Sequence, residues 1–147
     1  MSCDVDSRGV QAAPVTGNEA RQRPLFLCGV SAGFPSPADD YLDRRLDLHE
    51  HLVPHPDSTF FLRASGSSML GAGIHDGDLL VVDRSLQGSS GRVVIAVVDG
   101  ELTVKRLVMR EGKTLLVPEN PDFTAQDVTG RGDVWVWGVV TSVVHKL

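Results

Sequence analysis

The sequence predicts a mainly β protein: a compact domain of antiparallel strands, with a short N-terminal helix and a mobile N-terminal arm. Three observations support this prediction. From about residue 58 onward, β-branched and aromatic residues gather in short runs, as expected of strands. Turn-forming residues separate these runs. The first 23 residues are rich in Gly, Ser, Gln, Asp and Arg and show no sustained period, which is the composition of a flexible arm.

The composition limits the class of protein. A chain of 147 residues fits one domain plus a tail. Its net charge of −5 argues against direct sequence-specific DNA binding, which usually needs a basic face. No apolar run approaches the roughly 20 residues of a membrane-spanning helix, and the N-terminus lacks the order of a secretory signal. We therefore expect a cytoplasmic protein away from the membrane, in which Cys3 and Cys28 are free thiols.

The local patterns predict where the elements lie. A helix is expected over residues 36–46, because Ser36 suits the N-cap and Pro37 the first helical position. The apolar patch at residues 24–30 can dock as an extended strand. Asp99-Gly100, between two alternating runs, predicts a hairpin turn. The expected strands are residues 59–63, 79–82, 93–98, 102–108, 114–117 and 134–144.

One serine-rich corner has the properties of a nucleophile site. The sequence SGSSM at residues 65–69 follows an expected strand and precedes the glycines at 71 and 73. A serine at a glycine-flanked corner can expose its hydroxyl and leave backbone N–H groups free nearby. Acyl transfer needs both, as nucleophile and as donors to the developing oxyanion. The same pattern also occurs in ordinary Ser/Gly loops.

Lys105 interrupts the apolar strand 102–108. Alternation puts it on the same face as Thr103 and Leu107, whereas Arg106 points the other way. One of these cations therefore faces inward, or the strand lies at an edge where both side chains reach water. Burial disfavours the charged form of a lysine, so its pKa falls and its neutral amine can act as a base near neutral pH.

Three motifs follow one another in an order that resembles a known family. They are SGSSM at 65–69, GIHDGDLLVVD at 73–83 and VVDGELTVKRL at 97–107. This order is similar to that of the self-cleaving serine peptidases of the UmuD and LexA family, and the resemblance covers residues 33–144. It implies the LexA/UmuD-type fold, with Ser68 as nucleophile and Lys105, 37 positions later, as general base. The backbone N–H groups of Ser68 and Met69 would hold the oxyanion.

Within this family the chain looks more like UmuD than like LexA. The sequence FPSPADDY at residues 34–41 resembles UmuD, and about 30 loosely patterned residues ahead of it cannot supply a helix-turn-helix domain. Plasmid-borne relatives of UmuD fit equally well. The resemblance implies cleavage at Ala32-Gly33, because the scissile glycine of UmuD directly precedes this motif. The expected parts are then an arm, residues 1–32, and a β peptidase and dimerisation domain, residues 33–147.

Cys28-Gly29 is the alternative cleavage site, because some UmuD proteins use this dipeptide. Gly29 lies four residues farther from Ser68 than the family spacing allows. Small Ala32 also fits a narrow pocket, and Gly33 lets the backbone approach the nucleophile closely. We therefore predict Ala32-Gly33.

The resemblance also implies partners. It suggests a homodimer that is stimulated by the RecA–single-stranded DNA filament and then joins a UmuC-type Y-family DNA polymerase in translesion synthesis during the SOS response. Residues 134–144 form either a dimer strand or a central core strand. Three alternatives remain: a non-catalytic β interaction module, a LexA-like regulator without its DNA-binding domain, and a signal-peptidase-like enzyme.

Neither a cofactor nor a metal is expected. The chain has one histidine group and one aspartate group that superficially resemble metal motifs: His49, His51 and His55; Asp76, Asp78 and Asp83. The histidines match no common zinc spacing, so we expect them to be solvated loop residues. The turn at residues 76–78 accounts for the aspartates without calcium.

Overall fold

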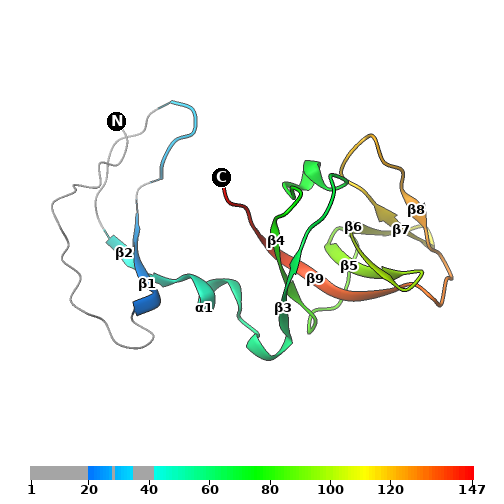
Figure 1. Ribbon diagram of the computed structural model, residues 1–147, viewed down its shortest axis with the longest axis horizontal. Coiled ribbons are helices and arrows are strands. Elements are labelled where there is room, and N and C mark those ends of the chain that lie inside the picture. The colour runs from blue at the N-terminus through cyan, green and yellow to red at the C-terminus, as the bar shows by residue number, and fades with distance from the viewer. Residues whose placement is uncertain (1–19, 28, 35–41) are drawn as a thin grey trace. The chain divides into compact units, whose positions relative to one another are not determined.

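The computed structural model describes residues 20–27, 29–34 and 42–147, and the chain divides into two compact units, Met1–His51 and Leu52–Leu147 (Figure 1). Most of the predicted arm, both cysteines and the first half of the predicted helix lie outside the described residues. The boundary at residue 32 follows the expected cleavage site and stays a prediction.

The first unit contains an antiparallel strand pair, β1 (Gln22–Phe26) with β2 (Leu42–Asp47), in which Gln22 lies opposite Asp47. The predicted helix is therefore wrong from Leu42 onward. Capping stabilises only a first turn and a short helix is marginal alone, so pairing with β1 prevails over the local signals. The extended segment expected at 24–30 is a strand only as far as Phe26, and its partner is β2.

The short helix of the structure, α1 (Leu48–Leu52), begins directly after β2. Asp47 caps it, since its Oδ1 accepts a hydrogen bond from the backbone N–H of Glu50 at 3.2 Å. The two histidines of this helix, His49 and His51, are exposed.

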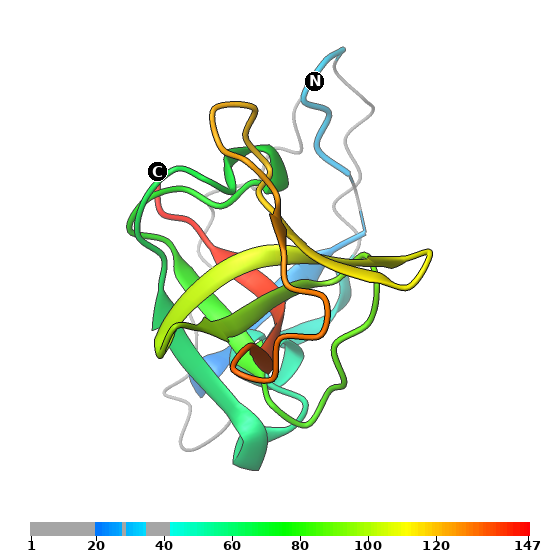
Figure 2. The same ribbon diagram turned by 90° about the vertical axis from the view of Figure 1, so that its right-hand side faces the viewer.

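The second unit is a seven-stranded sheet, strongly twisted (Figure 2), with the strand order β3-β4-β9-β5-β6-β7-β8. All neighbouring strands are antiparallel. The six strands predicted for this region are confirmed to within two residues, and the two-residue β8 is an addition. The strands are β3 (Thr59–Arg63), β4 (Leu79–Asp83), β5 (Val93–Val98), β6 (Glu101–Arg110), β7 (Lys113–Val117), β8 (Gln126–Asp127) and β9 (Trp135–Val144).

Two tight hairpins order the middle of this sheet. Asp99 and Gly100 have φ angles of 51° and 78°, which confirms the predicted turn between β5 and β6. Glu111 and Gly112, at 52° and 75°, make the same kind of turn between β6 and β7. These turns fix the register of β6, so that Lys105 lies opposite Val94.

β9 is an interior strand of the sheet, third of the seven in order. It pairs with β4 on one side and β5 on the other, and its Val139 is completely buried. Of the two interpretations of this segment, the central core strand is correct, because neither edge of β9 is left to pair with a second chain. Two apolar clusters pack on the sheet, one around Met69, Ile74 and Val82 and the other around Leu116 and Val139.

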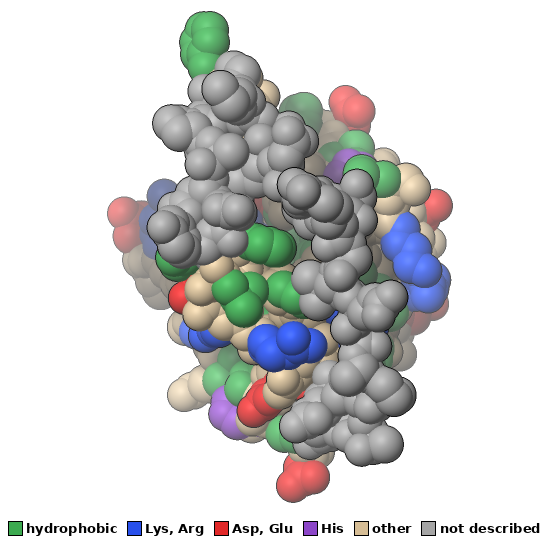
Figure 3. Space-filling view, turned by 90° about the vertical axis from the view of Figure 1, so that its left-hand side faces the viewer, with side chains coloured by type: hydrophobic (Ala, Val, Ile, Leu, Met, Phe, Trp, Pro, Cys, Tyr) green, Lys and Arg blue, Asp and Glu red, His purple; other side chains and the backbone are tan. Residues whose placement is uncertain are grey.

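The face of the molecule drawn in Figure 3 carries side chains of several kinds. On the face drawn in Figure 3, hydrophobic, basic and acidic side chains are intermixed. No helix among the described residues has the length and apolar character needed to cross a membrane.

Candidate active site

The predicted nucleophile lies in the loop between β3 and β4, residues 64–78. Hydrogen bonds of 2.8 Å between the backbones of Ala64 and Asp78, and of Gly77 and Ala64, close the base of this loop. Farther out, Asp76 Oδ1 accepts a hydrogen bond from the backbone N–H of Gly66 at 2.7 Å. Met69 is 2% exposed and anchors the loop in the core, which leaves its half-buried neighbour Ser68 in a defined position.

A second segment holds the loop from the other side. The carbonyl of Ser68 accepts the N–H of Glu119 at 2.8 Å, and the N–H of Gly71 donates to the carbonyl of Glu119 at 2.7 Å. The Asn120 side chain donates to the carbonyl of Ser67 at 2.8 Å. A Cβ atom at Gly71 would lie 2.7 Å from the carbonyl oxygen of Glu119, so this close approach requires glycine. Because about 50 residues separate the two segments, no local sequence signal indicated this contact.

Lys105 lies on β6 and faces this loop. Its Nζ donates hydrogen bonds to Ser68 Oγ at 3.1 Å, to Thr103 Oγ1 at 3.1 Å and to the carbonyl of Val104 at 3.0 Å. β6 pairs with β5 and β7, so the alternative of an edge strand is wrong. Burial lowers the pKa of Lys105 below its ordinary value of 10.5, because removing water disfavours the charged amine.

Arg106 takes the opposite side of the strand, as alternation predicts. Its Nε donates to the carboxylate of Glu119, and its guanidinium also donates to the carbonyl of Gly91 at 2.6 Å. Since the backbone of Glu119 holds both Ser68 and Gly71, the two adjacent cations of β6 act on the same loop. Lys105 contacts the serine directly, and Arg106 supports the segment that positions it.

The backbone around Ser68 offers the expected donors. Among the residues that the structure describes, no group accepts a hydrogen bond from the N–H of Ser68 or of Met69. The carbonyl of Met69 accepts the N–H groups of Ala72 and Ile74 at 3.0 and 3.2 Å, which fixes the turn. These two donors are therefore available to a negatively charged oxygen beside Ser68.

A cleft of about 220 Å³ lies beside the Ser68–Lys105 pair. Apolar side chains line much of it, including Leu62, Ile95 and Val104. Its largely apolar lining suits an apolar residue next to the bond that would be attacked.

The predicted cleavage site lies in the first unit. Ala32 and Gly33 are exposed, in the connection between β1 and β2, and the N–H of Gly33 donates to Ser31 Oγ at 3.2 Å. Among the described residues of this connection, 27 and 29–34, none belongs to a strand. Cys28, of the alternative site, lies outside the described residues.

A polar cluster surrounds Asp83, the last residue of β4. It corrects the expectation that His55 is only a solvated loop residue. His55 is not a merely solvated residue, since its Nδ1 contacts Asp83 Oδ2 at 2.5 Å. Ser58 and Ser85 donate to Asp83 Oδ1 at 2.9 and 2.6 Å. Burial by itself would raise the pKa of Asp83, but the hydrogen bonds from Ser85, His55 and Ser58 outweigh it and hold the pKa well below 3.8.

A Ser–Lys pair on a twisted antiparallel sheet, with free backbone donors and an adjoining cleft, is an arrangement of the serine peptidase class. Comparison with known proteins agrees: residues 24–141 match the family model for Peptidase S24-like proteins, and the chain belongs to that family.

Within this family the chain is similar to UmuD-family proteins and also to a LexA repressor. The chain is 51% identical to MucA of Salmonella typhimurium over 80% of this chain and 81% of MucA. It is 46% identical to ImpA of Shigella flexneri over 91% of both chains. It is also 34% identical to the LexA repressor of Bordetella parapertussis, over 96% of this chain and 65% of the repressor. The resemblance predicted from the three motifs is confirmed.

Proposed function

We propose that this chain cleaves itself once, between Ala32 and Gly33, with Ser68 as nucleophile and Lys105 as general base. The observation that carries the proposal is the 3.1 Å distance between Lys105 Nζ and Ser68 Oγ, at a lysine whose pKa burial lowers. A neutral amine at hydrogen-bond distance from a hydroxyl is the geometry that general-base activation requires.

The reaction proceeds in two steps. The neutral amine of Lys105 takes the proton of Ser68 Oγ, and this oxygen attacks the carbonyl carbon of Ala32. The N–H groups of Ser68 and Met69 stabilise the oxyanion while the bond to Gly33 breaks, and the lysine returns its proton to the leaving amine. Water then hydrolyses the ester on Ser68. The products are residues 1–32 and residues 33–147.

The family context supplies the biological role of this proposal. In it the shortened chain, as a cytoplasmic homodimer, joins a UmuC-type Y-family polymerase for translesion synthesis in the SOS response. Cleavage is stimulated by the RecA–single-stranded DNA filament. Nucleophile and substrate share one chain, so their effective concentration is high, and an external trigger is a reasonable means of restraint.

Mass spectrometry of the purified full chain tests the proposal. The chain is incubated at alkaline pH, or at neutral pH with RecA, an ATP analogue and single-stranded DNA. We expect a new N-terminus at Gly33, absent in Ser68→Ala and Lys105→Ala. Ser67→Ala is the matched control, because Ser67 lies in the same loop and its side chain makes no hydrogen bond among the described residues.

Two outcomes contradict parts of the proposal. A new N-terminus at Gly29 would show that Cys28-Gly29 is the site. The chain could also stay intact under both conditions, while the same RecA preparation promotes cleavage of a known substrate in parallel. That result would favour the non-catalytic interaction module. The small cleft and the free donors beside Ser68 argue against that module, because an interaction surface needs neither.

A further inference from the structure

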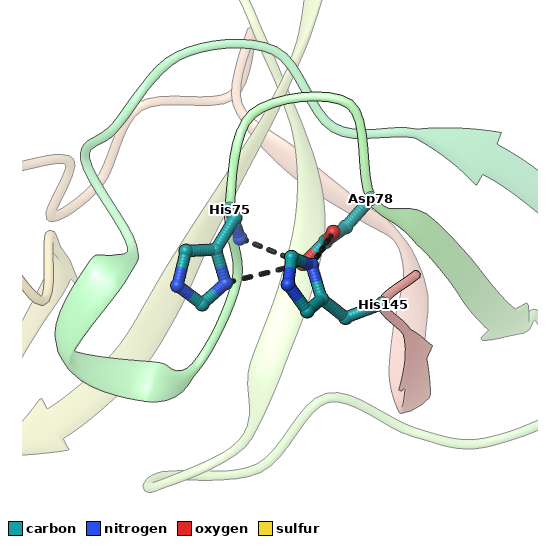
Figure 4. A group of neighbouring side chains, drawn as sticks. All are labelled: His75, Asp78 and His145. Atoms are coloured by element: carbon teal, nitrogen blue, oxygen red, sulfur yellow. Dashed lines mark hydrogen bonds and ion pairs between the residues drawn. The ribbon is translucent and has the colours of Figure 1, made fainter. Parts of the chain in front are cut away.

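A second cluster of chemistry-bearing side chains lies outside the Ser–Lys pair. His75 and Asp78 belong to the turn before β4, and His145 follows the last residue of β9 (Figure 4). β4 and β9 are paired with Leu79 opposite Val144, so the next step of the ladder brings Asp78 beside His145. The sheet register, rather than sequence proximity, assembles this group.

Asp78 is the centre of the cluster. Its carboxylate is only 4% exposed, and its Oδ2 accepts the backbone N–H of His75 at 2.8 Å. Oδ2 also lies 3.5 Å from His75 Nδ1, and Oδ1 lies 2.5 Å from His145 Nδ1. Figure 4 shows the three side chains grouped together, and the ring centroids of the two imidazoles are 4.5 Å apart.

These distances are close to those between the ligands of one metal ion. A tetrahedral ion bound about 2.0–2.2 Å from nitrogen and oxygen ligands holds those ligands roughly 3.3–3.6 Å apart. One ligand atom from each of His75, Asp78 and His145 lies within 4.8 Å of the others. Small side-chain rotations therefore suffice, with the ring proton of His145 on Nε2 so that Nδ1 can bind the ion.

We propose that His75, Asp78 and His145 bind a divalent transition-metal ion of the zinc class. Two imidazoles and one carboxylate form a donor set that Zn²⁺, Co²⁺ and Ni²⁺ prefer, whereas Mg²⁺ and Ca²⁺ prefer oxygen ligands alone. The histidine side chains are 49% and 42% exposed, so the ion has an entry path and room for a water as fourth ligand. The N–H of His75 orients the carboxylate, as outer-shell donors do in metal sites.

The site has a structural consequence. His75 lies in the same loop as Ser68. The carbonyl of Met69 accepts hydrogen bonds from the N–H groups of Ala72 and Ile74, and these bonds hold the loop together. A bound ion links this loop to the end of β9 and stabilises the folded chain, since the ligands are close together only there. This inference is independent of self-cleavage.

The test uses the full chain without a histidine tag, in a Ser68→Ala background that keeps its length constant. Zn²⁺ is titrated by calorimetry, and melting is followed with and without Zn²⁺. We expect one Zn²⁺ per chain and a raised Tm. His75→Ala and His145→Ala each weaken binding by at least about 10-fold, a loss that even an outer-shell change produces. His51→Ala, an exposed histidine of α1, is the matched control and leaves binding unchanged.

Cobalt gives a spectroscopic check that does not depend on stability. Co²⁺ should produce the visible absorption of a tetrahedral site, and His145→Cys should keep binding and add a thiolate charge-transfer band. Equal Zn²⁺ affinity in His145→Ala and the parent, or binding that is lost only in Cys3→Ser or Cys28→Ser, would overturn the proposal. So would preference for Mg²⁺ over Zn²⁺.

Discussion

Replacing Gly71 by alanine tests how closely the nucleophile loop must approach its supporting segment. The backbone N–H of Gly71 donates to the carbonyl of Glu119, and the carbonyl of Ser68 accepts the N–H of Glu119. The new Cβ would lie 2.7 Å from the Glu119 carbonyl oxygen, while ordinary contact begins at 3.4 Å. The loop and its support must therefore separate by about 0.7 Å.

This displacement sets the size of the expected effect. Misplacing a reacting group by about 1 Å can cost roughly 100-fold in rate, so we expect Gly71→Ala to slow self-cleavage by about 10- to 100-fold. The strain also lowers the free energy of unfolding by about 1–3 kcal/mol, the usual cost of overpacking. The hydrogen bonds of Lys105 to Thr103 and to the Val104 carbonyl lie within β6 and are retained, so the cleavage rate should still rise with pH as in the parent.

The assay measures the first-order rate of cleavage at alkaline pH, at a temperature at which both proteins are folded by circular dichroism. Gly132→Ala is the control, because no atom lies within 4 Å of its added Cβ. A Gly71→Ala rate within twofold of the parent would refute the reasoning. It would mean that the loop accepts a methyl group without moving Ser68.

Three further predictions follow from the same contacts. Lys105→Arg should abolish cleavage at every pH, because arginine stays protonated. The rate of the parent should instead rise with pH as Lys105 loses its proton, and a rate–pH profile of both proteins measures the difference. Thr103→Val should slow cleavage about 3- to 10-fold through loss of one hydrogen bond to the lysine, measured in the same assay. Ser58→Ala should lower the unfolding free energy by about 1.5–3 kcal/mol at pH 7. Because the folded pKa of Asp83 lies below 3.8, this loss should shrink as the pH falls below that value, measured by denaturant unfolding.

Much of the fold was predictable because its signals are local. Strands β3 to β7 and β9 are runs of β-branched residues between turns, and Asp99-Gly100 specifies its own hairpin. The error at residues 42–46 has the opposite origin. Those residues carry the polar and apolar spacing of a helix but find a strand partner about 20 positions earlier, and pairing of that range is invisible to local patterns.

The site divides in the same way. Ser68 and Lys105 were predictable from motifs around them, and alternation correctly predicted that Lys105 and Thr103 share a face. The support that Glu119 and Asn120 give to the serine loop was not predictable. Their contacts are made to backbone groups of the loop, which any residue carries. Predicting that His75 lies near His145 would have required the register between β4 and β9. His49 and His51, which superficially resembled a metal motif in the sequence, are exposed side chains of α1.

If the chain cleaves itself as proposed, the position of Lys105 predicts where control of cleavage acts. Its amine already contacts Ser68 Oγ, and supports from Asp76, Glu119 and Asn120 hold the serine loop from two sides. The proposed catalytic pair therefore needs no rearrangement, and we expect restraint to act on delivery of the Ala32-Gly33 segment. A trigger that works in this way should change the rate for Ala32-Gly33 in its own chain, but not the rate for a short peptide of residues 27–38 added in excess to the 33–147 fragment. If the RecA filament accelerated both equally, the trigger would act on the Ser68–Lys105 pair and this argument would fail.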